Sequence, residues 1–476
     1  MNSKSRNLLL ILLLWLAQGV PAWAQIGSFQ HIVVIVQENR TPDNLFQALC
    51  VSPFSCSTSP NAFQYNIQTS NWQDKTQRRG VIQPLPVPLV GHYDMDHAHI
   101  AFVKQCDLNA RKMTCAMDGE ASVACFGTCL TQPGFRFVDN STGILSPYLQ
   151  LAREYGWANY MFQTNQGPSF PAHQFIFGGT SAPSAADDAA GVFAAENLKG
   201  GVTLAGCIAS ASTLVRLISP PGVEQQFAYP CFEHNTIPDV LPGSVSWRYY
   251  TPTAGSIWTA PNAISHICQP NLPTGGTCVG PEWKNNVDLN PADVLTDISQ
   301  CALRNLSWVI PSGGNSDHSR MNTGGGPAWV AAIVNSIGTS PCQNADGSSY
   351  WDSTAILILW DDWGGWYDHE TPQLLAQPVG DYQYGFRVPL IVVSAYTGAG
   401  MIDNVRHDFG SILRFIERNF GASQGALNFA DARAKDSLTG FFDLRRVPRP
   451  FVPIVAGKAA AFFINDKTPL TDPDDD

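Results

Sequence analysis

The chain has 476 residues, of which 44% are hydrophobic and 14% charged, so it can bury a large core and lacks the composition of a disordered protein. Asp and Glu outnumber Lys and Arg by 39 to 28, which gives a net charge of −11 at pH 7. No block of basic residues stands out, so electrostatic capture of nucleic acid or of an anionic membrane is disfavoured.

The first 24 residues have the features of a signal peptide. Lys4 and Arg6 form a basic start, residues 8–16 are apolar, and residues 22–24 read A-W-A, a typical cleavage site. No later run approaches the ~20 apolar residues that a bilayer span requires. We therefore expect export to the periplasm or the medium, with no integral membrane segment after cleavage.

Short apolar runs and helical patterns alternate along the rest of the chain. Residues 32–36, 355–359 and 389–393 are unbroken apolar runs rich in β-branched residues, which suit strands buried on both faces of a parallel sheet. Helical spacing over residues 329–337 and 409–420 ends at Gly338 and Gly421. This alternation predicts a three-layer α/β sandwich around a mostly parallel central sheet.

No repeat or linker marks a boundary inside the chain. We expect one domain over residues 25–470, followed by an acidic tail at 471–476. Two loop-rich stretches, residues 50–131 and 181–277, are predicted as insertions near or over one end of the sheet.

All 12 cysteines lie after the cleavage site. An even number in an exported chain indicates disulfides, and the loop-rich insertions carry most of them. Close pairs such as Cys50 with Cys56, or Cys125 with Cys129, are plausible, but spacing alone does not fix the connectivity. The alternative is a zinc site, which lacks a CxxC pair and would use the clustered cysteines Cys106, Cys115, Cys125 and Cys129.

Acidic and amide side chains follow two of the predicted strands directly. Glu38 and Asn39 come after the first strand, and Asp361 and Asp362 come after the second. Because the carboxyl ends of parallel strands meet in one crevice, these groups would repel one another unless a cation lies between them. They predict a hard-metal site. The alternative is that Glu38 caps a helix and the Asp pair begins a solvated turn.

Ser169 is a candidate nucleophile. It lies shortly before Pro171, which can occupy the first turn of a helix, so its hydroxyl would face the positive helix end where a phosphoryl group is stabilised. The alternative is an ordinary N-cap serine. A G-x-S-x-G hydrolase turn is excluded because residue 171 is proline.

Several histidines lie in polar loops: His92, His97 and His99 are close together, and His318 follows Asp317. A histidine can bind a phosphoryl oxygen, protonate a leaving group or ligate a metal. Taken singly, each can equally be a structural hydrogen-bonding residue, and the cluster at 92–99 could form a separate metal site.

These segments together resemble a bacterial phosphoesterase family that includes phosphatidylcholine-type phospholipases C and secreted acid phosphatases. The motifs are E-N-R-T-P-D at 38–43, D-D-W-G-G-W-Y-D-H at 361–369 and G-F-R-V-P at 385–389. Weaker likenesses occur at 246–250, 307–311, 316–318 and 407–421, in family order. Pro42 departs from the family pattern, which has an aromatic residue there.

The resemblance implies an alkaline-phosphatase-like fold and hydrolysis of phosphate esters through a metal-activated hydroxyl, by way of a phosphoserine intermediate. Glu38, Asn39, Asp361, Asp362 and the Ser169 hydroxyl would hold a divalent metal of unspecified identity. The histidines that would serve the phosphoryl group are His97, His266 and His318, with His92 or His99 as alternatives to His97.

The segment at 167–174, G-P-S-F-P-A-H-Q, resembles the serine version found in the phosphatases more than the phospholipase version. The favoured interpretation is therefore a secreted acid-phosphatase-type phosphomonoesterase acting on small phosphate esters. One alternative is a phospholipase C-type phosphodiesterase acting on phosphatidylcholine-like lipids. The other is a non-catalytic exported binding protein on the same fold.

Overall fold

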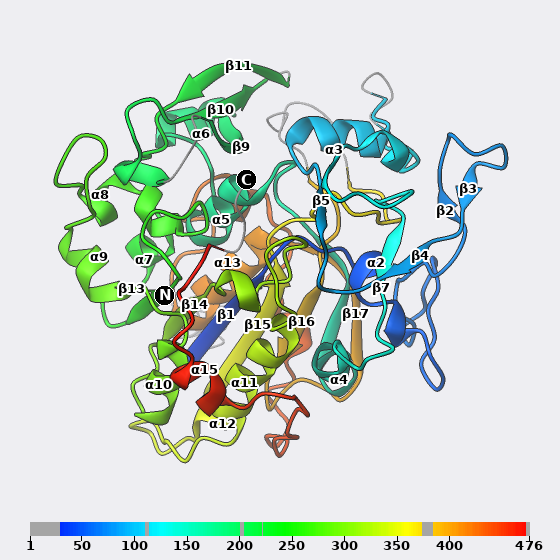
Figure 1. Cartoon of the computed structure of the whole chain (residues 1–476). Helices are drawn as coiled ribbons and strands as arrows, with labels where there is room; N and C mark the ends of the chain where they lie inside the picture. Colours follow the sequence, from blue (N-terminus) through cyan, green and yellow to red (C-terminus); the bar gives the residue numbers. More distant parts are fainter. Residues whose placement is uncertain (1–28, 110–113, 200–203, 221, 374–383, 473–476) are drawn as a thin grey trace, which may run out of the picture.

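The computed structural model describes residues 29–109, 114–199, 204–220, 222–373 and 384–472 (Figure 1). The predicted signal peptide, residues 1–24, and most of the predicted acidic tail lie outside the described residues. Within the described ranges, none of the helices has both the length and the hydropathy of a membrane span.

An eight-stranded sheet forms the centre of the molecule, in the order β13-β12-β14-β1-β15-β16-β8-β17. Its strands are β1 (His31–Gln37), β8 (Gly156–Phe162), β12 (Trp247–Tyr250), β13 (Val287–Asp288), β14 (Leu306–Val309), β15 (Thr354–Trp360), β16 (Leu390–Val393) and β17 (Met401–Asp408). The predicted strands correspond to β1, β15 and β16, and every residue of these three is buried. The mostly parallel sheet is confirmed. β16 alone runs antiparallel to both neighbours. The sequence pattern does not show this, because a strand buried on both faces has the same apolar run in either direction.

Helices cover both faces of the sheet, which confirms the three-layer prediction (Figure 1). One layer contains α4 (Ser146–Glu154), α10 (Asp293–Ser299), α11 (Gly326–Gly338), α12 (Tyr350–Ser353) and α15 (Ala460–Asn465). The other contains α5 (Ser169–Gly178), α7 (Ile237–Val240), α13 (Phe409–Phe420) and α14 (Phe429–Arg433). The predicted stop of α13 is confirmed, since Gly421 caps it with a φ of +79°.

Small elements added to this core gather at the end of the sheet where β1 and β15 finish (Figure 1). The first predicted insertion contains β2 (Trp72–Gln73), β3 (Val81–Ile82), β4 (Leu85–Val87), β5 (Tyr93–Met95), α3 (His99–Cys106) and β6 (Cys125–Gly127). The second contains α6 (Ala185–Ala190), a three-stranded sheet of β9 (Phe193–Lys199), β10 (Leu214–Ser219) and β11 (Val223–Ala228), and α8 (Ser265–Cys268). β12 also falls within residues 181–277 but joins the central sheet, so that part of the stretch belongs to the core.

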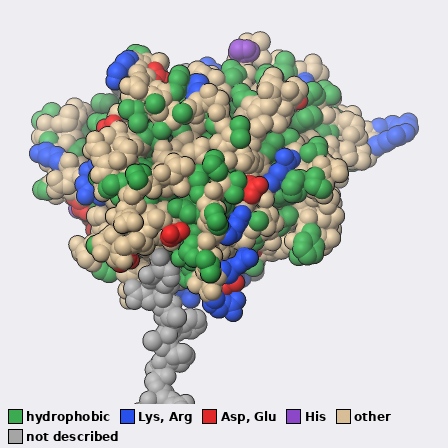
Figure 2. All heavy atoms as spheres, turned by 90° about the horizontal axis from the view of Figure 1, so that it is seen from below, with side chains coloured by type: hydrophobic (Ala, Val, Ile, Leu, Met, Phe, Trp, Pro, Cys, Tyr) green, Lys and Arg blue, Asp and Glu red, His purple; other side chains and the backbone are tan. Residues whose placement is uncertain are grey.

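Short elements complete the chain: α2 (Pro42–Leu45), β7 (Arg136–Val138), α9 (Pro281–Asn286) and the 3₁₀ turns η1 (Gln47–Leu49), η2 (Glu120–Ser122), η3 (Gly206–Ile208), η4 (Ala260–Ala263), η5 (Gly313–Asn315) and η6 (Thr439–Phe441). Figure 2 shows the face seen from below, where Lys and Arg side chains are scattered among apolar and polar ones rather than joined in one patch.

Six disulfides bond all 12 cysteines. They are Cys50–Cys56, Cys106–Cys115, Cys125–Cys129, Cys207–Cys231, Cys268–Cys278 and Cys301–Cys342. Both pairs named as plausible from spacing occur. The four clustered cysteines form two of these bonds, so the zinc alternative is not supported.

Candidate active site

Two neighbouring strand ends bring acidic and amide side chains to one edge of the sheet. β1 and β15 are parallel neighbours paired along their whole length, so Glu38 and Asp361 leave the sheet side by side. The Asn39 backbone N–H donates to Asp361 Oδ1 at 3.1 Å and joins the two strand ends. Glu38, Asn39, Asp361 and Asp362 are all fully buried.

The turn after β15 requires glycine. Gly364 has a φ of +60°, and a Cβ at this position would lie 2.4 Å from the carbonyl oxygen of Asn39. The Gly364 N–H donates to Asp362 Oδ1 at 2.6 Å, which orients the Asp362 carboxylate. This close approach explains the first glycine of the D-D-W-G-G-W motif.

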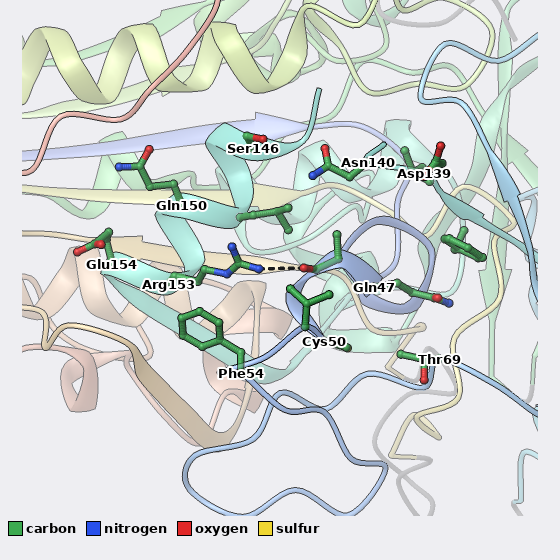
Figure 3. Close-up of a pocket in the computed structure, with 15 residues that line it drawn as sticks. Gln47, Cys50, Phe54, Thr69, Asp139, Asn140, Ser146, Gln150, Arg153 and Glu154 are labelled. Atoms are coloured by element: carbon green, nitrogen blue, oxygen red, sulfur yellow. Dashed lines mark hydrogen bonds between the residues drawn. The ribbon is translucent and has the colours of Figure 1, made fainter. Parts of the chain in front are cut away.

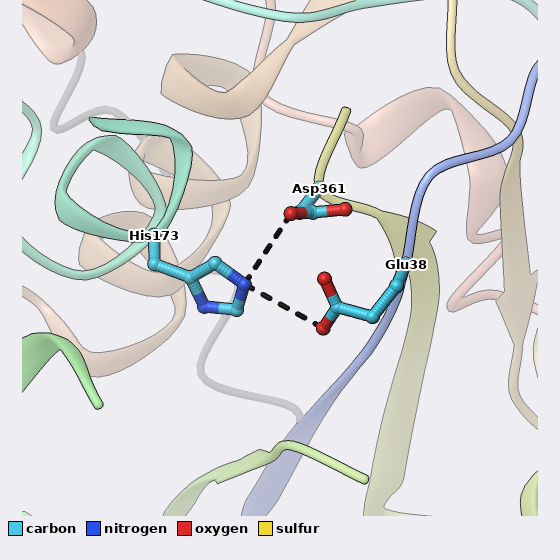
Figure 4. Close-up of side chains that lie close together, drawn as sticks. All are labelled: Glu38, His173 and Asp361. Atoms are coloured by element: carbon cyan, nitrogen blue, oxygen red, sulfur yellow. Dashed lines mark ion pairs between the residues drawn. The ribbon is translucent and has the colours of Figure 1, made fainter. Parts of the chain in front are cut away.

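A histidine from another element faces the two strand ends (Figure 4). His173 Nε2, on α5, lies 3.7 Å from Glu38 Oε1 and 3.6 Å from Asp361 Oδ2. One potential ligand atom from each of these three residues lies within 4.8 Å of the others. Glu38 Oε2 accepts a hydrogen bond from Trp258 Nε1 at 2.8 Å, which holds the Glu38 carboxylate in place.

Ser169 is the first residue of α5, and Pro168 occupies the cap position before it. The Ser169 hydroxyl donates to Asp362 Oδ2 at 3.1 Å, so it is engaged with the strand-end acids rather than with the backbone of its own helix. The N-cap alternative is therefore not what the structure shows. Ser169 and His173 are four residues apart in one helix, which places both on the face that meets β1 and β15.

The two adjacent aspartates have opposite pKa shifts. Burial opposes ionisation of Asp361, but the interaction with the nearby His173 imidazole outweighs burial and holds the pKa of Asp361 below its ordinary value. Burial, followed by the nearby Asp361 charge, raises the pKa of Asp362 well above its ordinary value. Without a bound cation, the site therefore disfavours two ionised aspartates side by side.

Two predicted histidines lie at the rim of this cluster. The Asn39 side-chain N–H₂ donates to His97 Nε2 at 3.2 Å, and His97 Nδ1 lies 2.9 Å from the Met95 carbonyl, so Nδ1 carries the proton. His318 Nε2 lies 3.5 Å from Asp94 Oδ2. The His97 and His318 rings are 6.1 Å apart, edge to face.

The other predicted histidines are placed elsewhere. His266, on α8, pairs with Glu233 Oε1 at 2.8 Å and with Asp239 Oδ2 at 3.3 Å, and the described contacts do not link it to Ser169 or the strand-end acids. His92 is exposed. His99 pairs with Glu224 and contacts Gln166, so the geometry favours His97 among the three alternatives at 92–99.

The cluster fits a divalent cation on two observations. Asn39 Oδ1, His173 Nε2 and Asp361 Oδ2 are buried, and none has a hydrogen bond within the described part of the chain. Among the described residues, Asp361 and Asp362 also have no ion pair with Lys or Arg. Oxygen donors with one imidazole suit a hard or borderline cation, and a cation there would neutralise the buried carboxylates.

Sequence reasoning missed His173. It is absent from the predicted site residues, although the spacing S-F-P-A-H at 169–173 is itself a signal. A histidine four residues after a candidate nucleophile in a helix lies on the nucleophile's face. The roles of Trp258 and Asp94 were also missed, and both come from segments without a local motif.

A hollow of about 960 Å³ on the flank of the molecule lies between η1 and α4 (Figure 3). Arg153 reaches across it, donating to the Ala48 carbonyl at 2.9 Å and lying over the Phe54 ring. None of the predicted site residues lines this hollow. We therefore assign no role in the proposed active site to this hollow.

Comparisons with known proteins agree with the motifs. A family model described as "Phosphoesterase family" matches residues 29–423. Non-hemolytic phospholipase C of Burkholderia pseudomallei is 24% identical over 229 residues, which are 39% of this chain and 32% of that protein. Phospholipase C B of Mycobacterium tuberculosis is 25% identical over 187 residues, 34% of each protein. The chain thus matches about a third of the length of these curated relatives.

Among solved structures, a protein of the alkaline phosphatase superfamily from Vibrio parahaemolyticus overlaps 59% of this chain and 61% of its own, with a TM-score of 0.31 and 10% identity.

Proposed function

The chain belongs to the phosphoesterase family, and from this premise we propose that it is a metal-dependent hydrolase of phosphate esters with Ser169 as its nucleophile. One observation carries the proposal: the Ser169 hydroxyl lies 3.1 Å from Asp362 Oδ2, beside the buried cluster of Glu38, His173 and Asp361. The N-terminal end of α5 adds a partial positive charge suited to a phosphoryl group.

Glu38, His173 and Asp361 would hold a divalent cation, with Asn39, Asp362 and the Ser169 hydroxyl beside it. A bound cation lowers the proton affinity of a serine hydroxyl and offsets the negative charge of a phosphate.

The residues of the chain then have distinct tasks. Ser169 Oγ forms a bond to phosphorus while the bond from phosphorus to the leaving oxygen breaks. Asp362 Oδ2, which already accepts the hydroxyl hydrogen bond, takes the Ser169 proton. The leaving oxygen takes a proton from solvent. Water then attacks phosphorus, the bond from phosphorus to Ser169 Oγ breaks, and Ser169 Oγ regains its proton from Asp362. His318, and His97 once its Nε2 is protonated, donate to the phosphoryl oxygens and stabilise their charge.

A phosphomonoesterase of the acid-phosphatase type is the first candidate, because the segment around Ser169 resembles the serine version of the motif. A phospholipase C-type phosphodiesterase is the second, because the curated relatives carry that name. A non-catalytic binding protein is disfavoured, since the predicted ligand residues are all present and converge. Six disulfides support export, because such bonds are rare in reducing compartments.

A substrate panel tests the proposal. Purified protein is assayed on a simple phosphomonoester and on phosphatidylcholine, each with and without a chelator. Release of inorganic phosphate that stops with chelator supports the first candidate, and release of phosphocholine supports the second. If neither substrate is hydrolysed after divalent metals are supplied, the proposal fails.

A further inference from the structure

We propose that the hollow where the two insertions meet is the subsite for the leaving group, and that it selects phosphate esters of small apolar alcohols. This inference rests on the proposed function. The hollow has a volume of about 450 Å³, and its lining includes His97 and Pro168. His97 contacts Asn39, and Pro168 immediately precedes Ser169, so the hollow adjoins the nucleophile.

Large apolar side chains line this hollow from both insertions. Ile100 of α3 is 53% exposed and Phe126 of β6 is 50% exposed, and Leu198 of β9 also lines the hollow. Half-exposed apolar side chains that share one concave surface are typical of a ligand site, because a ligand removes their area from water. α3 and β9 flank this end of the molecule in Figure 1.

The apolar side chains are presented by well-anchored segments. The Cys125–Cys129 disulfide and antiparallel pairing with β5 hold β6, which carries Phe126. Asn197, next to Leu198, accepts a hydrogen bond from the Phe170 N–H at 3.0 Å, which joins β9 to the start of α5. The subsite is therefore fixed relative to Ser169, as a specificity pocket must be.

The charges that line the hollow offset one another. Asp96 and Glu196 contribute two carboxyl groups, of which burial and the nearby Glu224 raise the pKa of Glu196 to about 7, and Lys199 and Arg216 contribute two cations. Arg216 also lies 3.4 Å from Glu224. No excess of either sign favours an ionic leaving group, so discrimination depends on the apolar surface. A volume of about 450 Å³ is within the usual range for small-molecule sites and suits a short alkyl chain or one aromatic ring.

A series of n-alkyl phosphates from ethyl to hexyl tests this subsite, because these esters have leaving groups of nearly equal intrinsic reactivity and differ in apolar length. For the metal-supplied wild-type protein, we expect kcat/KM to rise about twofold to fourfold for each added methylene. Phe126→Ala and Ile100→Ala should each lower the hexyl-to-ethyl ratio of kcat/KM by at least about fivefold, since they remove part of the apolar surface.

Phe63→Ala is the matched control. Phe63 belongs to the same insertion, is 85% exposed and does not line the hollow, so its removal should leave the hexyl-to-ethyl ratio unchanged. Circular dichroism establishes that each variant is folded, and if only one subsite variant folds, that variant decides the test.

The outcomes separate the two proposals. If the wild type hydrolyses the esters without dependence on chain length, or if both subsite variants keep the wild-type ratio, the subsite is wrong and the proposed function stands. If no phosphate ester is hydrolysed, the proposed function is overturned and the subsite with it.

Discussion

The protein contains two buried acid clusters that differ in how their charge is balanced. The site cluster has Glu38, Asp361 and Asp362, and the imidazole of His173 lies 3.7 Å from Glu38 and 3.6 Å from Asp361. In the second cluster, Arg387 Nη2 lies 2.9 Å from Asp368 Oδ2 and 3.4 Å from Asp43 Oδ1. Both clusters contain three potential metal-ligand atoms close together, so proximity alone does not distinguish them.

The guanidinium of Arg387 makes the second cluster self-sufficient. It is fully buried and also donates to the carbonyls of Asn66 at 2.7 Å and Asn159 at 2.9 Å. Burial alone would lower the pKa of Arg387, but Asp368 and Asp43 raise it above its ordinary value. This difference indicates that buried carboxylates paired with a guanidinium are structural, whereas those with only an imidazole beside them need a cation from outside.

The largest expected effect is at Ser169. Ser169→Ala should lower the rate of phosphate release by at least about 10⁴-fold, because it removes the nucleophile. Acid-quenched wild-type mixtures should carry phosphate on the peptide that contains Ser169. The Ala variant should melt within a few degrees of the wild type, since the charges of both clusters remain.

Wild-type turnover by Ser169→Ala would contradict the covalent mechanism. Inversion of configuration at phosphorus would do the same, because direct attack by water inverts and two successive displacements retain.

The second effect contrasts the two clusters directly. Asp361→Asn and Glu38→Gln should each release the bound metal and lower activity by about 10²-fold or more, because each removes ligand charge. Asp368→Asn is the matched change in the other cluster and should keep the metal. The metal content of each variant is measured by mass spectrometry after gel filtration. If all three variants retain the metal equally, the metal lies elsewhere.

The third effect is on stability. Arg387→Met should lower the free energy of unfolding by roughly 3–5 kcal/mol, since it leaves Asp43 and Asp368 buried without their cation. The difference in unfolding free energy between the wild type and Arg387→Met should be the same with and without added metal, because the metal binds at the other cluster. Urea unfolding with and without chelator measures both points, and a variant as stable as the wild type would show that the second cluster does not depend on Arg387.

The smallest effect is at His266, which lies outside both clusters. Its hydrogen bond to Asp239, with help from Glu233 and against partial burial, raises the pKa of His266 to about 9. His266→Gln should cost under about 1 kcal/mol of unfolding free energy after solvent screening. Because the folded pKa is the higher one, this cost is fully present below pH ~6.5 and disappears as the pH rises through 9.

Phosphate release by His266→Gln should stay within about twofold of the wild type. A loss of 100-fold or more would show that His266 serves the site despite its separate position.

The sequence predicted the parts of the molecule that depend on local pattern. β1, β15, α11 and α13 followed from apolar spacing, and the meeting of Glu38 with Asp361 followed from their places at the ends of parallel strands. The direction of β16 did not, because a strand buried on both faces has the same composition either way. His173 was missed because its significance depends on the packing of α5 against two strands, which no local pattern specifies.

The role predicted for His266 depends on a different kind of argument. It came from family resemblance in a region where the loops vary, and the structure places it against Glu233 and Asp239 instead. The relative positions of residues at strand ends followed from the sequence, whereas the positions of residues in the insertions depend on packing between distant segments.

The residue-by-residue pairing of β1 with β15, which ends with Gln37 opposite Trp360, sets a rule for how this protein can change. Exchanging one buried apolar residue for another inside either strand alters packing but keeps Glu38 beside Asp361. Deleting or inserting a single residue in one strand would move its acid by one position and turn it to the opposite face of the sheet. The lengths of these two strands are therefore under tighter constraint than their composition.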